Sequence, residues 1–440
     1  MTAARRTGAT NGKSEVPPSA HFQHRAGVLC VDGLPLDAIA AELGTPAYVY
    51  SAAAIASAFD AIDAALAGSP HLVAYAVKAN ANLAILSRLA RAGAGADIVS
   101  GGELARARKA GFAPERIVFS GVGKSDAEIE AALQAGVRSI HAESEQEIDA
   151  IEAAAERLGT RARIALRVNP DVDPSTHPYI ATGLRDSKFG LDLEAARRLL
   201  PRLVRSPRLS LEGVACHIGS MVRSPEPIGE AVEITARFAR ECVAAGAPLR
   251  TLDAGGGWPI TYGDEDGEAA AHARFGHTIL EAIRRGGGDL GLTVLVEPGR
   301  SIVGDSCVLL TRVLYVKEQS GKRFVIVDAA MTELIRPALY GAYHAIVPVA
   351  EPSPSAPRSA ADVVGPVCES GDFLAQERSL PPLQRGDLLA IRGAGAYGAA
   401  MASNYNGRPF APEALVENGQ LRLIRARQPI EALWQNDIVD

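Results

Sequence analysis

Residues 72–99 read LVAYAVKANANLAILSRLARAGAGADIV and contain two apolar runs separated by an amphipathic stretch. The runs Leu72–Val77 and Ala96–Val99 are short, apolar and followed by polar or small residues, which is typical of buried strands. Between them, Leu83–Ala92 places its apolar residues three and four positions apart, as a helix with one buried face does. The stretch therefore predicts a strand, a helical crossover and a second strand parallel to the first.

The same alternation of short apolar runs and amphipathic stretches continues to about residue 300. Eight strands are predicted, namely Leu72–Val77, Ala96–Val99, Ile117–Ser120, Ser139–His141, Arg163–Val168, Gly213–Cys216, Thr251–Asp253 and Thr293–Val296. The helices predicted between them include Leu83–Ala92, Glu103–Ala110, Asp126–Ala135, Ser144–Leu158, Leu193–Leu203 and Pro227–Ala245. Eight such units in about 230 residues predict a TIM-like (β/α)8 barrel, and a doubly wound open sheet is the structural alternative.

A mostly β domain is predicted after the barrel. Val308–Lys317 and Arg323–Val327 flank a Ser-Gly turn and predict a hairpin. Further strand-like runs are Ala345–Val349, Asp362–Val367, Asp387–Arg392 and Leu421–Arg425, and two runs before the barrel, Gly27–Asp32 and Pro46–Tyr50, are expected to join them. The predicted organisation is a disordered tail (1–22), an N-terminal segment of the β domain (23–50), the barrel (51–305) and the β domain (306–440).

The composition of the chain favours an enzyme of the cytoplasm that acts on small molecules. Its 440 residues suffice for two domains, and a net charge of −6 without a basic stripe gives no reason to expect nucleic-acid binding. Five widely spaced cysteines without a C-x-x-C motif favour neither disulfides nor a zinc site. No apolar run reaches the roughly 18 residues of a membrane span. We therefore expect no membrane, nucleic-acid or metal partner.

Polar side chains and glycines follow the predicted strands, where barrel enzymes carry their active sites. Lys78 lies in YAVKAN (75–80) among apolar neighbours, and burial there would leave its amine neutral and able to form an imine. A lysine that extends from a strand end to solvent is the alternative. Other strand ends supply Asp97, His217, the glycines Gly255, Gly256 and Gly257, and Glu297, which precedes Gly299 and Arg300. Taken singly, the histidine also fits a core position and the glycines a flexible turn.

Together these groups match the requirements of pyridoxal 5'-phosphate (PLP). The aldehyde needs an amine, which Lys78 offers, and the phosphate needs amide donors, which Gly255–Gly257 offer. The ring needs a flat face to stack on, which His217 can provide. The pyridine nitrogen withdraws electrons well only when protonated, and Glu297 can supply the carboxylate that keeps it so. The sequence therefore predicts a PLP enzyme.

The chain resembles the fold-type III PLP-dependent decarboxylases, and among them the diaminopimelate decarboxylases. The resemblance runs from about His21 to Ala432 and is carried by YAVKAN (75–80), ADIVSGGEL (96–104), FSGVGK (119–124), RVNPDVD (167–173), KFG (188–190), HIGS (217–220), EPGRSIVG (297–304), VDAAMTELIRPALYGAYH (327–344), GPVCESGD (365–372) and GAYGAAMASNYN (395–406). It implies a PLP barrel and a β domain in a head-to-tail homodimer with active sites at the subunit interface.

The resemblance also implies roles for the site residues. The cofactor would be held by Lys78 as an imine, by Glu297 at the pyridine nitrogen, by His217 on the ring, and by Ser220 and Gly257 at the phosphate. The other residues expected in the cofactor site are Asp97, Gly255, Gly256, Gly299 and Arg300. The substrate would be contacted by Arg300, Arg336, Tyr340 and Glu369, with Tyr397 touching cofactor or substrate. Cys368 would donate a proton from the partner subunit. From the residues alone, Cys368 also fits a small buried hydrophobe and Arg336 a surface charge.

The implied reaction is decarboxylation of meso-2,6-diaminopimelate at its D-centre to give L-lysine and CO2. Arg300 and Arg336 suit a distal carboxylate, because guanidinium binds carboxylate in a bidentate fork, and Glu369 suits the distal ammonium. The alternatives are a decarboxylase of D-ornithine, D-lysine, carboxynorspermidine or an N-modified diaminopimelate, and a regulatory protein without turnover. Two departures from the family pattern, Met221 for Gln and Trp258-Pro259 for Leu-Gly, border the predicted phosphate site.

Overall fold

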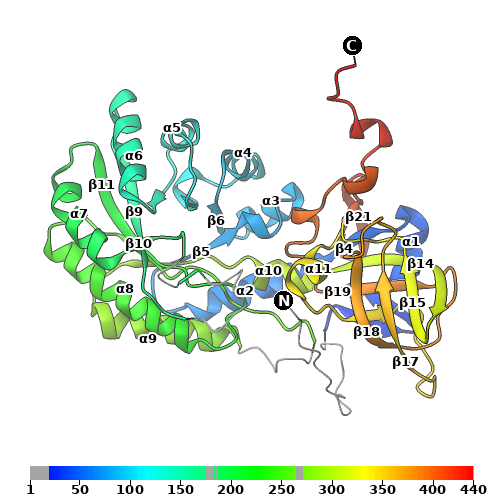
Figure 1. Cartoon of the computed structure of the whole chain (residues 1–440). Helices are drawn as coiled ribbons and strands as arrows, with labels where there is room; N and C mark the ends of the chain where they lie inside the picture. The colour runs from blue at the N-terminus through cyan, green and yellow to red at the C-terminus, as the bar shows by residue number, and fades with distance from the viewer. Residues whose placement is uncertain (1–18, 174–181, 184–186, 264–270, 440) are drawn as a thin grey trace.

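The structure, a computed structural model, describes residues 19–173, 182–183, 187–263 and 271–439. Parallel strands with helices outside them form a barrel. Figure 1 shows beside this barrel a β domain to which the blue N-terminal part and the yellow-to-orange C-terminal part of the chain both contribute. Most of the predicted disordered tail, up to residue 18, lies outside the described residues. None of the helices in the described part of the chain has the length and apolarity that crossing a bilayer requires.

Eight parallel strands form the closed ring. In order around it they are β5 (His71–Ala76), β6 (Gly95–Ile98), β7 (Ile117–Phe119), β8 (Ser139–Ala142), β9 (Ala162–Asn169), β11 (Leu209–Ala215), β12 (Thr251–Asp253) and β13 (Thr293–Val296). Pairing of β13 with β5 closes the ring, while the short β10 (Leu191–Asp192) pairs with β9 outside it. The closure excludes an open doubly wound sheet, and the predicted barrel is confirmed.

Helices cover the outside of the barrel. They are α2 (Ala52–Ala65), α3 (Leu83–Arg91), α4 (Gly101–Ala110), α5 (Asp126–Ala135), α6 (Glu145–Arg157), α7 (Leu193–Arg205), α8 (Glu226–Ala244) and α9 (His272–Gly287). Three successive helices begin at a Ser-x-x-Glu sequence, in which the side chain of Ser100, Ser125 or Ser144 accepts a hydrogen bond from the amide three residues later. These caps satisfy amides that a helix leaves unpaired and fix where the chain turns from strand to helix.

The β domain is centred on the long strand β14 (Cys307–Gln319). Three strands pair with it directly, namely β4 (Ala47–Ser51), β15 (Lys322–Val327) and β19 (Leu388–Arg392). The same sheet, built from both ends of the chain, also contains β16 (Ile346–Pro348), β17 (Ser359–Val364), β18 (Phe373–Leu380), β20 (Glu413–Glu417) and β21 (Gln420–Arg425). β4 lies between β14 and β20, so the predicted contribution of the N-terminal segment is confirmed. A smaller sheet of β1 (Phe22–Arg25), β2 (Val28–Val31) and β3 (Leu34–Pro35) leads into α1 (Leu36–Leu43).

Candidate active site

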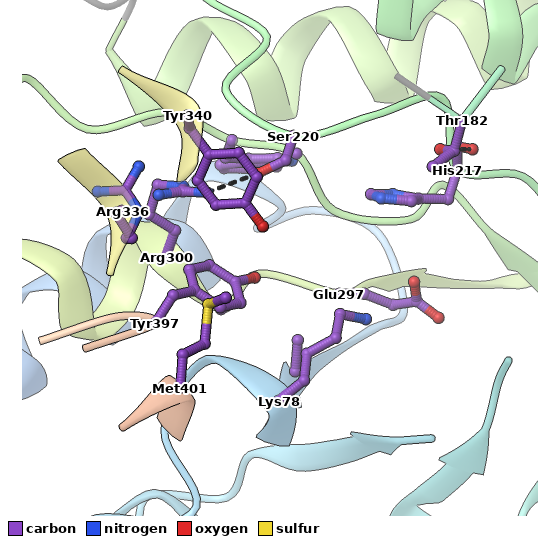
Figure 2. A pocket seen from close by; sticks show the side chains of 14 residues that line it. Lys78, Thr182, His217, Ser220, Glu297, Arg300, Arg336, Tyr340, Tyr397 and Met401 are labelled. Carbon is purple, nitrogen blue, oxygen red and sulfur yellow. Dashed lines mark hydrogen bonds between the residues drawn. The ribbon is translucent and has the colours of Figure 1, made fainter. Parts of the chain in front are cut away.

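A cavity of about 220 Å³ opens where the carboxyl ends of the barrel strands meet the β domain (Figure 2). Its walls are formed by Ala76, Lys78, Thr182, His217, Ser220, Gly257, Trp258, Glu297, Gly299, Arg300, Arg336, Tyr340, Tyr397 and Met401. Ten of these residues follow barrel strands or their loops, and the last four come from the β domain. The cavity is therefore built by both domains, at the strand ends where the sequence predicted the site.

Lys78 reaches the cavity from a turn directly after β5, and it pairs with a fully buried carboxylate. Its Nζ lies 2.9 Å from Oδ2 of Asp97, at the end of β6. Burial by itself lowers the pKa of the Lys78 amine, but Asp97 and then Glu297 outweigh it and raise that pKa above its usual value. The expectation that burial leaves this amine neutral is therefore wrong, because buried carboxylates stabilise the charged form.

The three glycines after β12 pack directly against neighbouring strand ends. A Cβ on Gly255 would lie 2.4 Å from the carbonyl oxygen of Cys216, and one on Gly256 would lie 2.2 Å from that of Glu297. Such contacts exclude any side chain. Two of the amides are used inside the protein, since Gly255 donates to Oδ1 of Asp253 (2.8 Å) and Gly256 to Nδ1 of His217 (3.1 Å). The prediction that all three amides are offered to a phosphate is therefore wrong, and only Gly257 lines the cavity.

His217 presents a neutral ring to the cavity. Because its Nδ1 accepts the Gly256 amide, the proton of the neutral imidazole lies on Nε2. Burial, with Arg167 and Lys78 nearby, holds the pKa of this imidazole well below its usual value. The hydroxyl of Thr182 donates to the His217 carbonyl oxygen at 2.8 Å, and Figure 2 shows the ring pointing into the cavity near Glu297. The Gly256 amide thus orients the ring, and Thr182 fixes the backbone that carries it.

Glu297 follows β13 and is almost fully buried at the floor of the cavity. The Ser120 hydroxyl donates to its Oε1 at 3.2 Å. Burial, together with the neighbouring Asp253, raises the pKa of the Glu297 carboxyl well above its usual value, while Lys78 opposes this rise. A cationic nitrogen beside Glu297 would therefore favour its ionised form.

Two buried arginines form the opposite end of the cavity (Figure 2). Arg300, in the short helix α10 (Arg300–Val303), donates to the Tyr262 hydroxyl (2.6 Å) and to Ser220 Oγ (3.0 Å) and lies over the Tyr397 ring at 4.7 Å. Arg336, in α11 (Arg336–Tyr340), lies 4.6 Å from the centroid of the Tyr262 ring. The Nε atoms of both arginines are buried and have no hydrogen-bond partner among the described residues. This end of the cavity is therefore suited to an anion.

Two predicted site residues do not line the cavity. Cys368 and Glu369 are exposed in the loop between β17 and β18. The Cys368 amide donates to Oδ1 of Asn406 at 2.9 Å, and the Tyr405 hydroxyl donates to Glu369 at 3.4 Å. Within the described part of one chain, these two side chains are therefore not brought together with Lys78. Their predicted entry from a partner subunit stays a prediction.

Of the two departures from the family pattern, one reaches the cavity. Trp258 lines it and is buried, with its ring 5.3 Å from that of Phe275 in α9, and its indole nitrogen has no partner among the described residues. Met221 is not among the lining residues and has a positive φ of 61°, which few side chains adopt. The indole of Trp258 therefore gives the cavity a flat, largely apolar wall.

Sequence reasoning missed several residues of the site. Thr182, Met401 and Ala76 line the cavity, and Ser120, His141, Asp253, Tyr262 and His344 support residues that do. A signal existed for six of them, because Ser120, His141 and Asp253 close predicted strands, and Ala76, His344 and Met401 lie in motifs that carry the resemblance. For the other two, Thr182 and Tyr262, neither a strand end nor a motif points to the site.

Comparisons with known proteins agree with this geometry. Residues 52–304 match the family model described as the pyridoxal binding domain of pyridoxal-dependent decarboxylases. A diaminopimelate decarboxylase of Neisseria meningitidis serogroup A is 48 % identical over 93 % of this chain and 99 % of that protein, and one of Aquifex aeolicus is 45 % identical over 93 % and 95 %.

Two solved structures extend the similarity to the whole fold. The Helicobacter pylori diaminopimelate decarboxylase complexed with L-lysine has 44 % sequence identity and a TM-score of 0.87, covering 91 % of this chain and 98 % of that one. The M. jannaschii diaminopimelate decarboxylase in co-complex with L-lysine has 34 % identity and a TM-score of 0.90, covering 96 % and 98 %. The chain therefore belongs to the pyridoxal-dependent decarboxylases and, within them, to the diaminopimelate decarboxylase family.

Proposed function

We propose that this protein is a PLP-dependent carboxy-lyase that converts meso-2,6-diaminopimelate into L-lysine and CO2 by removing the carboxylate of the D-centre, the last step of lysine biosynthesis. One observation carries the proposal: a single cavity holds Lys78 at one end and two buried guanidinium groups, Arg300 and Arg336, at the other. The similarity to relatives named for this activity, two of them solved with L-lysine, supports the same substrate.

The residues present fit PLP. Lys78 would hold its aldehyde carbon, His217 its ring face, Glu297 its pyridine nitrogen, and Gly257 and Ser220 its phosphate. The unpartnered buried Nε atom of Arg300, with Ser220 beside it, is the kind of site that an anionic group completes. When bound, PLP supplies a ring that accepts the electron pair of the carbon–carboxylate bond as that bond breaks.

Side chains of the protein would bind the substrate, position Lys78 and exclude water. Arg336 and the charge of Arg300 would bind the distal carboxylate of the substrate and so fix which of its two centres lies beside Lys78. Asp97 holds the Lys78 amine in place and balances its charge. The phenolic rings of Tyr340 and Tyr397 line the cavity between these ends and limit access of water to it. Diamines without a distal carboxylate would leave the arginine end unfilled.

The proposal includes a homodimer in the cytoplasm. Cys368 and Glu369 are exposed in this chain, so they could complete the cavity of a second copy, with Cys368 donating a proton to the substrate carbon and Glu369 binding the distal ammonium. Mixing the K78A variant with the C368A variant tests this arrangement. Half of the re-formed dimers would carry one intact site, so activity should return to about a quarter of the wild-type value. No recovery, with mixed dimers shown to form, would reject shared sites.

The substrate is tested with purified holoenzyme on a panel of amino acids. We expect CO2 and L-lysine from meso-diaminopimelate and at least about 100-fold lower kcat/KM for D-lysine, D-ornithine, carboxynorspermidine and N-modified diaminopimelates, because each lacks or blocks one charged group that the cavity binds. Release of CO2 from another member of the panel, and none from meso-diaminopimelate, would overturn the proposed substrate.

A further inference from the structure

A chain of four polar side chains lies buried beneath the cavity, one from the end of each of four strands. Ser120 follows β7, His141 lies in β8, Asp253 ends β12 and Glu297 follows β13. All four are between 1 % and 9 % exposed. Glu297 lines the cavity, whereas the other three do not. The cluster therefore reaches the reacting groups through Glu297.

The contacts join these side chains into one row. Ser120 Oγ lies 3.2 Å from Oε1 of Glu297 and 3.2 Å from Nδ1 of His141. On the other edge of the ring, His141 Nε2 lies 4.0 Å from Oδ2 of Asp253. This Oδ2 is buried and has no donor within hydrogen-bond distance among the described residues, while the other oxygen of Asp253 accepts the Gly255 amide. The Asp253 carboxyl also interacts directly with that of Glu297. A buried oxygen without a donor is costly as a carboxylate and acceptable as a hydroxyl.

The cations around this row are already paired with other carboxylates. Lys78 pairs with Asp97 (2.9 Å), Arg167 with Glu143 (2.9 Å) and Lys124 with Glu147 (2.7 Å). Asp253 and Glu297 each place an oxygen within 4.8 Å of the other and of a His141 nitrogen. Two carboxylates this close in a low-dielectric site cannot both ionise, so the pair retains one proton.

The directions of the pKa shifts agree with one proton being retained by the two carboxyls. Burial raises the pKa of Asp253 to about 7 and lowers that of His141 to about 3, so the imidazole is neutral and carries a single ring proton. Burial, with Asp253 beside it, also raises the pKa of Glu297 well above its usual value, so burial does not decide which of the two carboxyls holds the proton. The cavity-lining position of Glu297 distinguishes the two carboxyls, because only its charge can meet a cation in the cavity.

We propose that His141 and Ser120 are positioning residues that keep Glu297 ionised by linking it to Asp253, which holds the one proton that the two carboxyls share; this rests on the proposed PLP chemistry. The donors then all point one way: the Asp253 hydroxyl to Nε2 of His141, Nδ1–H of His141 to Ser120, and the Ser120 hydroxyl to Glu297. The first contact, at 4.0 Å, is about 1 Å longer than a hydrogen bond, and a small rotation of either side chain closes it.

Two substitutions at Asp253 separate this role from simple packing. D253N keeps an oxygen for the Gly255 amide and puts an NH2 donor where the proton would be, so it mimics the protonated acid. D253L removes both. We expect D253N to retain kcat/KM within about threefold, and D253L and H141F each to lose at least about tenfold in kcat with KM little changed. The double variant H141F/D253L should have the same kcat as H141F, because either substitution alone already interrupts the row of hydrogen bonds.

A readout that needs no turnover locates the proton directly. The infrared spectrum of the wild-type holoprotein at pH 7, minus that of D253N, should contain the carbonyl band of a protonated carboxylic acid. The matched control is T235V, which deletes one buried hydroxyl that donates to the Ala231 carbonyl oxygen and contacts the Cys216 thiol, outside the row, and should leave the band and the activity unchanged. A difference spectrum without the band, or D253N as inactive as D253L, would overturn the proposal. If the band is present but meso-diaminopimelate yields no CO2, the proposed substrate fails and the proton assignment stands.

Discussion

A neutral histidine holds Arg336 in place. The guanidinium Nη1 donates to Nε2 of His344 at 2.7 Å, and the other ring nitrogen of His344 donates to the carbonyl oxygen of Arg392 at 2.8 Å. Burial and the neighbouring Arg336 keep the pKa of this imidazole well below its usual value, so it can accept the hydrogen bond. The position of one guanidinium that we propose binds substrate thus depends on a residue that does not line the cavity.

Substitution of this histidine should weaken substrate binding and spare the chemical step. We expect H344F to raise KM for meso-diaminopimelate about tenfold, which is the value of one lost hydrogen bond to a charged group, and to change kcat by less than about threefold. Steady-state kinetics measure both. H277F, at an exposed position on α9, is the control and should match the wild type. A fall in kcat at unchanged KM would assign His344 to catalysis instead.

Single residues with a chemical signature could be predicted from the sequence, whereas their supports could not. Lys78, His217, Glu297, Arg300 and Arg336 all line the cavity where the motifs indicated. The use of the Gly255 and Gly256 amides by Asp253 and His217 depends on contacts between residues about 2 and 39 positions apart, which a linear pattern does not reveal. The charge of Lys78 was mispredicted for the same reason.

Elements with a clear periodicity were also predictable. The eight barrel strands lie within a few residues of their expected positions, because buried parallel strands are continuous apolar runs. Two strands of the β domain were missed. Glu413–Glu417 reads EALVE, a composition that favours a helix, and becomes strand β20 only by pairing with β4 and β21. Phe373–Leu380 contains polar residues and a positive φ at Glu377, so its alternation is broken.

The loop after β12 should tolerate no side chain. We expect G256A to destabilise the protein by about 1–3 kcal/mol and to weaken PLP binding, because the new Cβ would force the backbone away from Glu297 and withdraw the amide from His217. Thermal unfolding and a cofactor titration would measure the two effects. G123A is the matched control, since a Cβ on Gly123, in the loop after β7, meets no atom within 4 Å. Equal behaviour of the two variants would contradict the close packing.

At the scale of the whole molecule, a buried polar network ties the barrel to the β domain. Glu413 of β20 accepts from the Tyr50 hydroxyl (2.7 Å) and from Asn82 (3.2 Å) and pairs with Arg425 (2.7 Å). Asn80, two residues after Lys78, donates in turn to Tyr50 (2.9 Å). The placement of Lys78 is therefore coupled to strands from both ends of the chain.

Removal of the central carboxylate should uncouple the domains. We expect E413L to lower the free energy of unfolding by about 3 kcal/mol, because the buried Tyr50 hydroxyl loses its acceptor, Asn82 loses one of its acceptors and Arg425 loses its carboxylate, and to lower the affinity for PLP as well. Chemical denaturation and cofactor titration are the measurements. E417L, which breaks a partly exposed pair with Arg88, should cost less than about 1 kcal/mol. Similar losses in both variants would mean that the network contributes nothing beyond a surface pair.

The most direct test of the account is to identify the amine that holds the cofactor. Borohydride reduction of the holoprotein fixes the imine, and peptide mapping by mass spectrometry locates it. We predict that the cofactor is found on Lys78 and that the K78A variant carries none. Lys124 is also buried and lies beside His141, so it is the natural competitor. Label on Lys124 or any other lysine, with Lys78 unmodified, would contradict the assignment of the cavity and of every residue placed around it.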